Sequence, residues 1–129
     1  MWYEITLQPH GREGEFCAEV HVPAESPWFQ GHFPGNPVLP GIAQLGVVFE
    51  VIRQSLRQDL RVTQVSRVRF KQMILPDDRM VVRVKRKPGG SGQYAFRILK
   101  EKELICNGDM TVEPNSPVAE CVVNGAEER

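Results

Sequence analysis

Apolar and polar residues alternate in the first part of the chain. Residues 1–8 (MWYEITLQ) and 15–22 (EFCAEVHV) carry β-branched or aromatic residues at roughly every second position, and a turn containing glycine separates the two runs. Alternation of this kind is typical of half-buried β-strands, and two such runs around a short turn indicate a hairpin. We therefore expect the chain to begin with two antiparallel strands.

The pattern changes to a helical period after Pro40. From Gly41 to about Gln58 apolar side chains recur every three or four residues, and Pro40 suits the first turn of a helix. The first half of this segment is apolar on nearly every face, so the predicted helix must be enclosed by other elements. The recurring apolar positions are Ile42, Leu45, Val48, Phe49, Ile52 and Leu56.

Extended runs fill the chain after this helix, at residues 61–74, 79–87, 93–101 and 102–114. Short breaks separate them, which predicts antiparallel strands joined by hairpins. The whole pattern predicts an α+β fold in which an antiparallel sheet wraps around one long central helix. We expect this domain to cover residues 1–113. Residues 114–129 lose the periodic pattern and are expected to form a mobile tail.

Composition narrows the possible functions. Sixteen basic and sixteen acidic side chains cancel, so no overall charge favours nucleic acid or a membrane surface. The three cysteines lie far apart without a CxxC spacing, which argues against a disulfide framework or a zinc site. Residues 1–10 have neither the basic start nor the long apolar run typical of a secretion signal, so we expect no export. No apolar run in the sequence is long enough to span a bilayer. These features favour a cytoplasmic protein without a metal site.

One histidine lies in a stretch of restricted backbone just before the helix. His32 belongs to GHFPGNPVLPG, residues 31–41, in which three prolines reduce the conformational freedom of the chain. Imidazole titrates near neutral pH, so a histidine held in this way suits the role of a general base. The alternative is a structural loop histidine that bonds only the backbone.

The same segment, followed by an apolar helix, resembles the active-site region of the β-hydroxyacyl-acyl carrier protein dehydratases, which have the hotdog fold. The likeness continues through RVRFKQMILPDDRMVVRV and KELICNGDMTV and covers roughly residues 1–113. LPGIAQL is also similar to the subgroup acting in aryl-polyene and related carrier-protein pathways. The resemblance implies a lyase of fatty-acid or polyketide-type synthesis. Its substrate would be a 3-hydroxyacyl thioester on the phosphopantetheine of an acyl carrier protein, with no metal or redox cofactor.

The resemblance also implies roles for individual residues. It makes His32 the catalytic base, and it makes the backbone N–H of Gly41, at the positive end of the helix, the donor that holds the thioester oxygen. Phe33 and Gly46 would lie beside the substrate. The family carries a helix acid fourteen residues after the histidine, and in this chain that position is Gly46.

Three explanations for the missing acid remain open. Glu50 lies one helical turn after Gly46, and helical side chains lean toward the N-terminus, so its carboxyl group could fill the space beside Gly46 and stay protonated among valines. In this family the two subunits of a dimer share each site, so a partner chain could instead supply the acid in a heterodimer. Otherwise His32 acts alone or the chain binds acyl groups without dehydrating them. The structural alternative for Glu50 is a carboxylate with a local polar partner.

Basic residues gather between residues 61 and 87, where nine basic residues meet two acidic ones. Arg67, Arg69 and Lys71 share one face of a predicted strand by alternation. A solvated face is the default interpretation. The functional one is a docking surface for an acidic acyl carrier protein. Three basic residues of the next predicted strand also share a face, namely Arg83, Lys85 and Lys87.

Oligomeric state and alternative functions complete the predictions. A small hotdog domain leaves strand edges exposed, so we expect a homodimer or a heterodimer and possibly a higher oligomer. A hotdog acyl thioesterase and a non-catalytic acyl-binding subunit are the alternative functions. Nucleic acid is not an expected partner.

Overall fold

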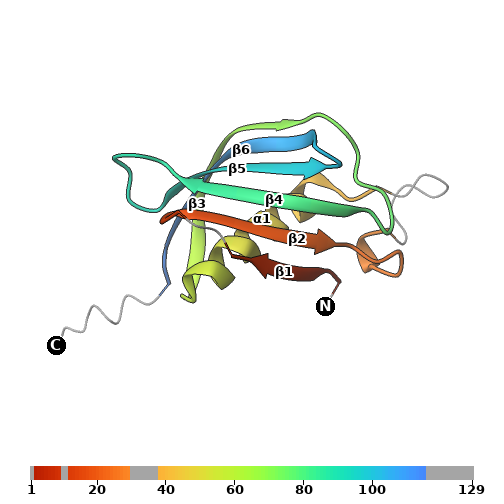
Figure 1. Ribbon diagram of the computed structural model, residues 1–129, viewed down its shortest axis with the longest axis horizontal. Coiled ribbons are helices and arrows are strands. Elements are labelled where there is room, and N and C mark those ends of the chain that lie inside the picture. The colour runs from red at the N-terminus through yellow and green to blue at the C-terminus, as the bar shows by residue number, and fades with distance from the viewer. Residues whose placement is uncertain (1, 10–11, 30–37, 116–129) are drawn as a thin grey trace.

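The computed structural model describes residues 2–9, 12–29 and 38–115, which form one antiparallel sheet and one α-helix (Figure 1). The helix, α1, spans Gly41–Leu56, and a short 3-10 helix, η1, spans Pro27–Phe29. No helix in these residues is both long and apolar enough to cross a bilayer. The strands are β1 (Glu4–Gln8), β2 (Glu15–His21), β3 (Leu60–Phe70), β4 (Arg79–Arg86), β5 (Gln93–Lys100) and β6 (Glu103–Pro114).

The sheet has the strand order β1-β2-β4-β5-β6-β3, and every neighbouring pair is antiparallel. Strand β6, the last one in the described residues, therefore lies between β5 and β3, and β3 forms an edge. In Figure 1 one face of the sheet is turned toward the viewer and α1 lies behind it. We call the side toward the viewer the outer face and the side that packs on α1 the inner face.

The alternation of the sequence explains which side chains form the core. On β4, Met80, Val82 and Val84 are buried against the helix, and Arg83 between them is exposed on the outer face. The helix contributes six buried side chains, five of them apolar. The sheet and the helix therefore both bury apolar surface away from water, which stabilises the fold. These helix residues are Ala43, Gln44, Val47, Val48, Val51 and Ile52. The predicted architecture, a sheet wrapped around one central helix, is thus confirmed.

Two predicted boundaries were wrong. The helix ends at Leu56 rather than near Gln58, because Arg57 adopts a left-handed conformation (φ 55°, ψ 43°) and donates its N–H to the carbonyl of Arg53. The strand predicted for residues 61–74 ends at Phe70. The N–H groups of Lys71 and Gln72 still bond to the carbonyl of Ile105 in β6. The chain then crosses toward the start of α1, where the carbonyl of Ile74 accepts a hydrogen bond from the N–H of Leu39 (2.8 Å).

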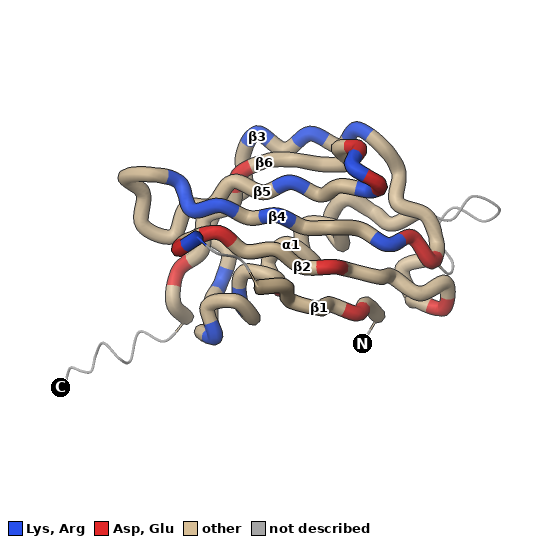
Figure 2. Tube along the Cα trace, viewed as in Figure 1, with Lys and Arg blue, Asp and Glu red and all other residues tan. Residues whose placement is uncertain are grey.

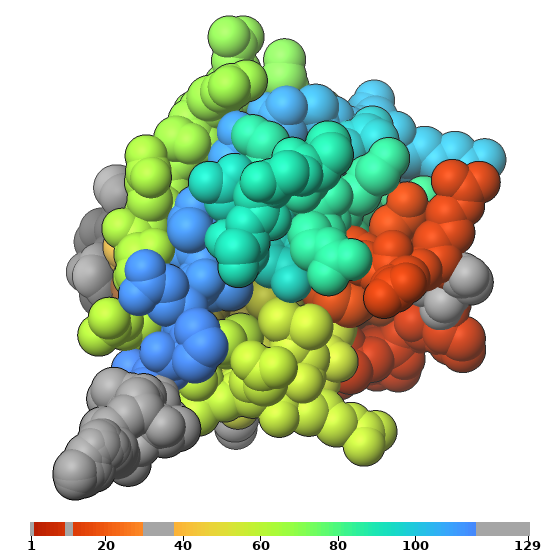
Figure 3. Space-filling view, turned by 90° about the vertical axis from the view of Figure 1, so that its left-hand side faces the viewer, coloured from red at the N-terminus to blue at the C-terminus, as the bar shows by residue number. Residues whose placement is uncertain are grey.

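The two ends of α1 have different surroundings. Figure 3 looks onto the end of the molecule where the last turns of the helix lie near the β4–β5 connection. The helix starts at the opposite end, beside the chain segment that follows β3. Because Leu39 is tied to Ile74 there, two segments distant in the sequence together hold the first residue of the helix in place.

Candidate active site

Gly41 is the first residue of α1, and its position follows from the residue before it. Pro40 is the N-cap, with an extended backbone (φ −63°, ψ 155°), and its carbonyl accepts hydrogen bonds from the N–H groups of Ala43 (3.0 Å) and Gln44 (3.1 Å). No side chain of residues 2–9, 12–29 and 38–115 caps this end of the helix. Among the described residues, the N–H of Gly41 has no hydrogen-bond acceptor, as expected for the first turn of a helix. Within this part of the chain it is therefore a free donor at the positive end of the helix dipole.

The ring of Phe70 packs against the backbone of Gly41. A Cβ atom placed on Gly41 would lie only 2.7 Å from Cζ of Phe70, so glycine is what permits this approach. Phe70 is half exposed (50%), and the neighbouring Ile42 on the helix is 70% exposed. Met73 and Leu75, from the segment that crosses to the helix start, are also exposed apolar side chains. The free N–H of Gly41 thus lies at an uncovered apolar surface, which suits contact with an acyl chain or a partner subunit.

Gln44 belongs to this region but was not among the predicted site residues. Its side chain is only 4% exposed, and its Nε2 donates a hydrogen bond to the carbonyl of Leu39 (3.1 Å). Its Oε1 atom is buried and has no donor among the described residues. A buried, unpaired amide oxygen is costly, so it calls for a donor from a bound molecule or from outside the described residues. The signal in the sequence was a polar residue in the apolar half of the helix.

The described residues leave open space beside Gly46. A Cβ atom at this position would meet none of their atoms within 4 Å, apart from the immediate chain neighbours and the backbone of the helix itself. Glycine in a helix interior costs roughly 1 kcal/mol relative to alanine. Packing in the described chain does not require the glycine, so the space beside it is available to another group.

Glu50 does not fill that space. Its carboxylate points to Arg53, one turn further along the helix, with Oε1 2.6 Å from Nη2 and both carboxylate oxygens within 3.2 Å of Nε. The expectation that this carboxyl group reaches back over Gly46, alone among valines, was therefore wrong. The physical reason is that a residue three positions away on a helix is a neighbour, and a guanidinium group binds a carboxylate with two parallel hydrogen bonds.

Tyr3 is the third member of the group around Glu50. Its side chain is buried in the core, and its pKa is raised, first by burial and then by the negative charge of Glu50. The structure thus shows Glu50 as a carboxylate with a local polar partner, which was the structural alternative considered from the sequence. A catalytic role for Glu50 stays a prediction.

The other predicted site residues fall into two groups. His32 and Phe33 lie outside the described residues. Arg67 and Arg69 lie on β3, where Arg67 reaches Asp109 of β6 (Nε to Oδ2, 3.5 Å) and Arg69 stands opposite Asn107. Lys71 follows the strand and is exposed. None of the three contacts the start of the helix in a hydrogen bond or ion pair among the described residues.

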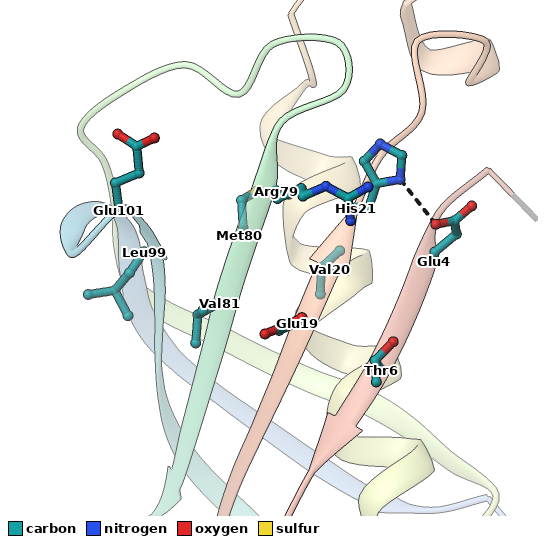
Figure 4. A pocket seen from close by; sticks show the side chains of 10 residues that line it. All are labelled: Glu4, Thr6, Glu19, Val20, His21, Arg79, Met80, Val81, Leu99 and Glu101. Carbon is teal, nitrogen blue, oxygen red and sulfur yellow. Dashed lines mark hydrogen bonds and ion pairs between the residues drawn. The ribbon is translucent and has the colours of Figure 1, made fainter.

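A separate group of charged side chains surrounds His21. One ring nitrogen lies 3.0 Å from a carboxylate oxygen of Glu4 (Figure 4), and the other lies 3.2 Å from a carboxylate oxygen of Asp77. The same oxygen of Asp77 accepts the N–H of Ala24. The histidine thus links β1, β2 and the turn before β4, which is a structural role. Within the described ranges no group of three or more His, Cys, Asp or Glu side chains is arranged to hold a metal ion.

Comparisons with known proteins bear on both the fold and the chemistry. The family described as "ApeI-like: ApeI dehydratase" matches residues 8–109. A 3-hydroxyacyl-[acyl-carrier-protein] dehydratase FabZ of Chloroflexus aggregans is 30% identical over 122 residues, which cover 88% of this chain and 83% of that protein.

Solved structures share the fold at lower identity. The dehydratase heterocomplex ApeI:P from Xenorhabdus doucetiae superimposes with a TM-score of 0.71 at 20% identity, over 81% of this chain and 91% of the other. A hypothetical thioesterase from Streptococcus pneumoniae with coenzyme A superimposes with a TM-score of 0.59 at 18% identity, over 87% and 89% of the two chains. The predicted hotdog fold is thus confirmed, and the fold by itself does not separate dehydratases from thioesterases.

Proposed function

This chain belongs to the ApeI-like dehydratase family, and from that premise we propose that it eliminates water from a 3-hydroxyacyl thioester carried on an acyl carrier protein. The observation that carries the proposal is the free N–H of Gly41 at an uncovered apolar surface. A thioester oxygen accepting this hydrogen bond would gain negative charge during the reaction, at the positive end of α1.

The proposed reaction consists of proton transfers. His32 takes the proton from the carbon beside the thioester carbonyl, and the electron pair left behind is delocalised onto the oxygen held by Gly41. The bond to the 3-hydroxyl group then breaks, and this oxygen leaves as water after an acid gives it a proton. The product is a 2-enoyl thioester. The substrate is neither oxidised nor reduced, so the elimination needs no redox cofactor.

The mechanism also needs an acid that protonates the leaving 3-hydroxyl oxygen. Two observations favour a second chain: Glu50 is bound to Arg53, and the space beside Gly46 is open. We therefore propose that a partner subunit supplies the proton donor, in a dimer whose site combines two chains. Support comes from the exposed apolar side chains at the start of α1 and on the edge strand β3, where Val62 and Val65 lie uncovered.

Carrier recognition and location complete the proposal. Arg67, Arg69 and Lys71 are proposed to dock an acidic carrier protein, and their exposure supports it. Arg69 and Lys71 are the better candidates, because Asp109 already neutralises part of the charge of Arg67. Cys17 and Cys106 are free thiols, which supports a reducing compartment such as the cytoplasm.

A single incubation tests the proposed reaction. Purified chain is mixed with a 3-hydroxyacyl group on a holo-carrier protein, and mass spectrometry follows the carrier. Loss of one water from the bound acyl group supports the dehydratase. Release of the free acid would identify a thioesterase instead. If neither product forms, the assay is repeated with a dehydratase-like partner chain, and activity only in the mixture supports the shared site.

His32→Ala is the matched test of the base. The substitution should abolish elimination, alone or in the mixture, and His10→Ala should leave the rate unchanged. Elimination that persists in the His32 variant would contradict the proposed mechanism.

A further inference from the structure

Two arginines on the outer face of the sheet stand directly opposite each other. Arg83 of β4 pairs in register with Arg97 of β5, and both side chains are exposed. Side chains opposite each other on neighbouring antiparallel strands have Cβ atoms about 5 Å apart. Like charges directly opposite each other on neighbouring strands destabilise a sheet. Figure 2 shows Lys and Arg positions on β4, β5 and β3, spread over the face that is turned toward the viewer.

The carboxylates nearby do not neutralise this pair. Within residues 2–9, 12–29 and 38–115, neither Arg83 nor Arg97 has an ion pair. Asp109, on the outer side of β6, lies 3.2 Å from Lys87 and 3.5 Å from Arg67. The repulsion between the two arginines is therefore not compensated by the described part of the chain.

A small pocket opens between these two arginines. It has a volume of about 240 Å³, and its lining includes Arg83, Lys85, Arg97 and Ala95. Ala95 stands opposite Lys85 in the β4–β5 register, and its short side chain leaves room between the longer ones. Glu15 also lines the pocket, 3.9 Å from the ammonium group of Lys85. The lining thus carries three cations and one carboxylate, together with the apolar residues Phe16, Val84 and Ala95.

We propose that this pocket binds the phosphate group of a small phosphorylated molecule. A phosphomonoester carries a charge of about −1.5 to −2 at pH 7 and presents three acceptor oxygens, so it can bridge two guanidinium groups and turn their repulsion into attraction. Guanidinium groups bind phosphate with paired hydrogen bonds. The site lies on the outer face, across the sheet from α1, so it is distinct from the proposed catalytic site.

The recess favours a small ligand over an acidic protein. A carboxylate side chain carries one charge on two oxygens, and it would leave part of the positive charge of the three cations unbalanced. A phosphate group brings more charge into the same volume. Binding of an acidic polypeptide is therefore the competing outcome that the experiment must separate.

Isothermal titration of the full chain with inorganic pyrophosphate, at constant ionic strength, tests the proposal. Arg83→Gln and Arg97→Gln should each weaken pyrophosphate binding about tenfold or more, which is the effect of one charge-assisted hydrogen bond. Arg79→Gln is the matched control, because Arg79 lies on the same face of the same strand but does not line the pocket. It changes the net charge equally and should leave the affinity within twofold.

Thermal unfolding shows whether the variants fold. Both arginine variants should unfold at the same temperature as the parent chain or higher, because the substitution removes a like-charge contact. Pyrophosphate should then raise the unfolding temperature of the parent chain and of Arg79→Gln, but not of Arg83→Gln or Arg97→Gln.

Three results would overturn the proposal. The first is no binding of pyrophosphate by the parent chain, and the second is an equal loss of affinity in the Arg79 control, which would indicate a general charge effect. The third is a poly-glutamate peptide that binds in an Arg83-dependent manner where pyrophosphate does not, which would identify a surface for acidic proteins.

Discussion

The ring of Phe70 lies against the backbone of Gly41, so close that a Cβ atom on the glycine would come within 2.7 Å of the ring. Phe70 comes from the end of an edge strand and Gly41 from the start of the helix, twenty-nine positions apart in the sequence. Their contact joins a free backbone donor to an exposed aromatic surface. This relationship leads to the first prediction.

Gly41→Ala should separate activity from stability. The exposed Phe70 ring can rotate away from the new methyl group, and alanine favours a helix, so the unfolding temperature should stay the same or rise slightly. The methyl group would crowd the N–H that holds the thioester oxygen, and turnover should fall about 10²- to 10³-fold. Rates on carrier-bound substrate and thermal unfolding check this. Full activity in Gly41→Ala would remove the N–H from the mechanism, and Phe70→Leu in the same background tests the ring's part in the crowding.

Gly46→Glu should install an acid in the space that the structure leaves open. No atom of the described residues crowds a Cβ at this position, so the variant is expected to fold. If the chain lacks only the proton donor, the variant should dehydrate substrate without a partner. Its turnover rate should exceed that of the parent chain about 10²-fold or more. Gly46→Gln has the same shape without the acid and should show no gain. Equal rates for the glutamate and glutamine variants would show that the missing acid does not limit the reaction.

Glu50→Gln and Arg53→Met together separate a catalytic role of Glu50 from a structural one. Both substitutions break the ion pair, and only the first removes the carboxyl group. If Glu50 only holds Arg53 in place, the two variants should lose the same small fraction of activity and stability. A loss of turnover confined to Glu50→Gln would instead assign the acid to Glu50. Steady-state rates are compared with denaturant unfolding of the same preparations.

The β5–β6 turn is strained, because Glu101 and Lys102 both have positive φ values (51° and 72°). A two-residue turn of this kind favours Asn-Gly. Replacing the pair by Asn-Gly should raise the free energy of unfolding by about 1 kcal/mol, since part of the relief is offset by the flexibility of glycine in the unfolded chain. Urea denaturation measures the change. Asn-Gly at the helical pair Gln54 and Ser55, which are partly exposed, should destabilise instead, because glycine disfavours a helix.

Cys106 should make stability fall at alkaline pH. Its thiol is fully buried, and burial raises its pKa to about 11, whereas an unfolded thiol titrates near 8.5. Because the unfolded state loses its proton first, this contribution is complete below about pH 8.5 and disappears as the pH rises toward 11. Unfolding free energies of the parent chain and Cys106→Ala across this range should converge as the pH rises. A constant difference would contradict the role of the thiol.

Local patterns predicted most of the fold correctly. The helix begins at Gly41, directly after Pro40 as the sequence pattern indicated, and the strands follow the two-residue alternation seen in Met80, Val82 and Val84. Such features depend on neighbours in the chain, so the sequence contains them directly. The wrong boundaries, at Phe70 and Leu56, lie where contacts with distant residues or a left-handed cap end an element.

The family and its chemistry could also be inferred from the sequence, through the segment from Gly31 to Gly41, and His32 remains the predicted base. The sequence could not show that Glu50 turns toward Arg53 or that the Phe70 ring packs against Gly41. Nor could it show that Arg97 pairs with Arg83 across neighbouring strands. These relationships depend on which rotamers pack best and on how strands distant in sequence pair, and both are decided by the whole folded chain. Sequence alone therefore determined the elements and the reaction class, while the tertiary structure decided which charges meet and which spaces stay open.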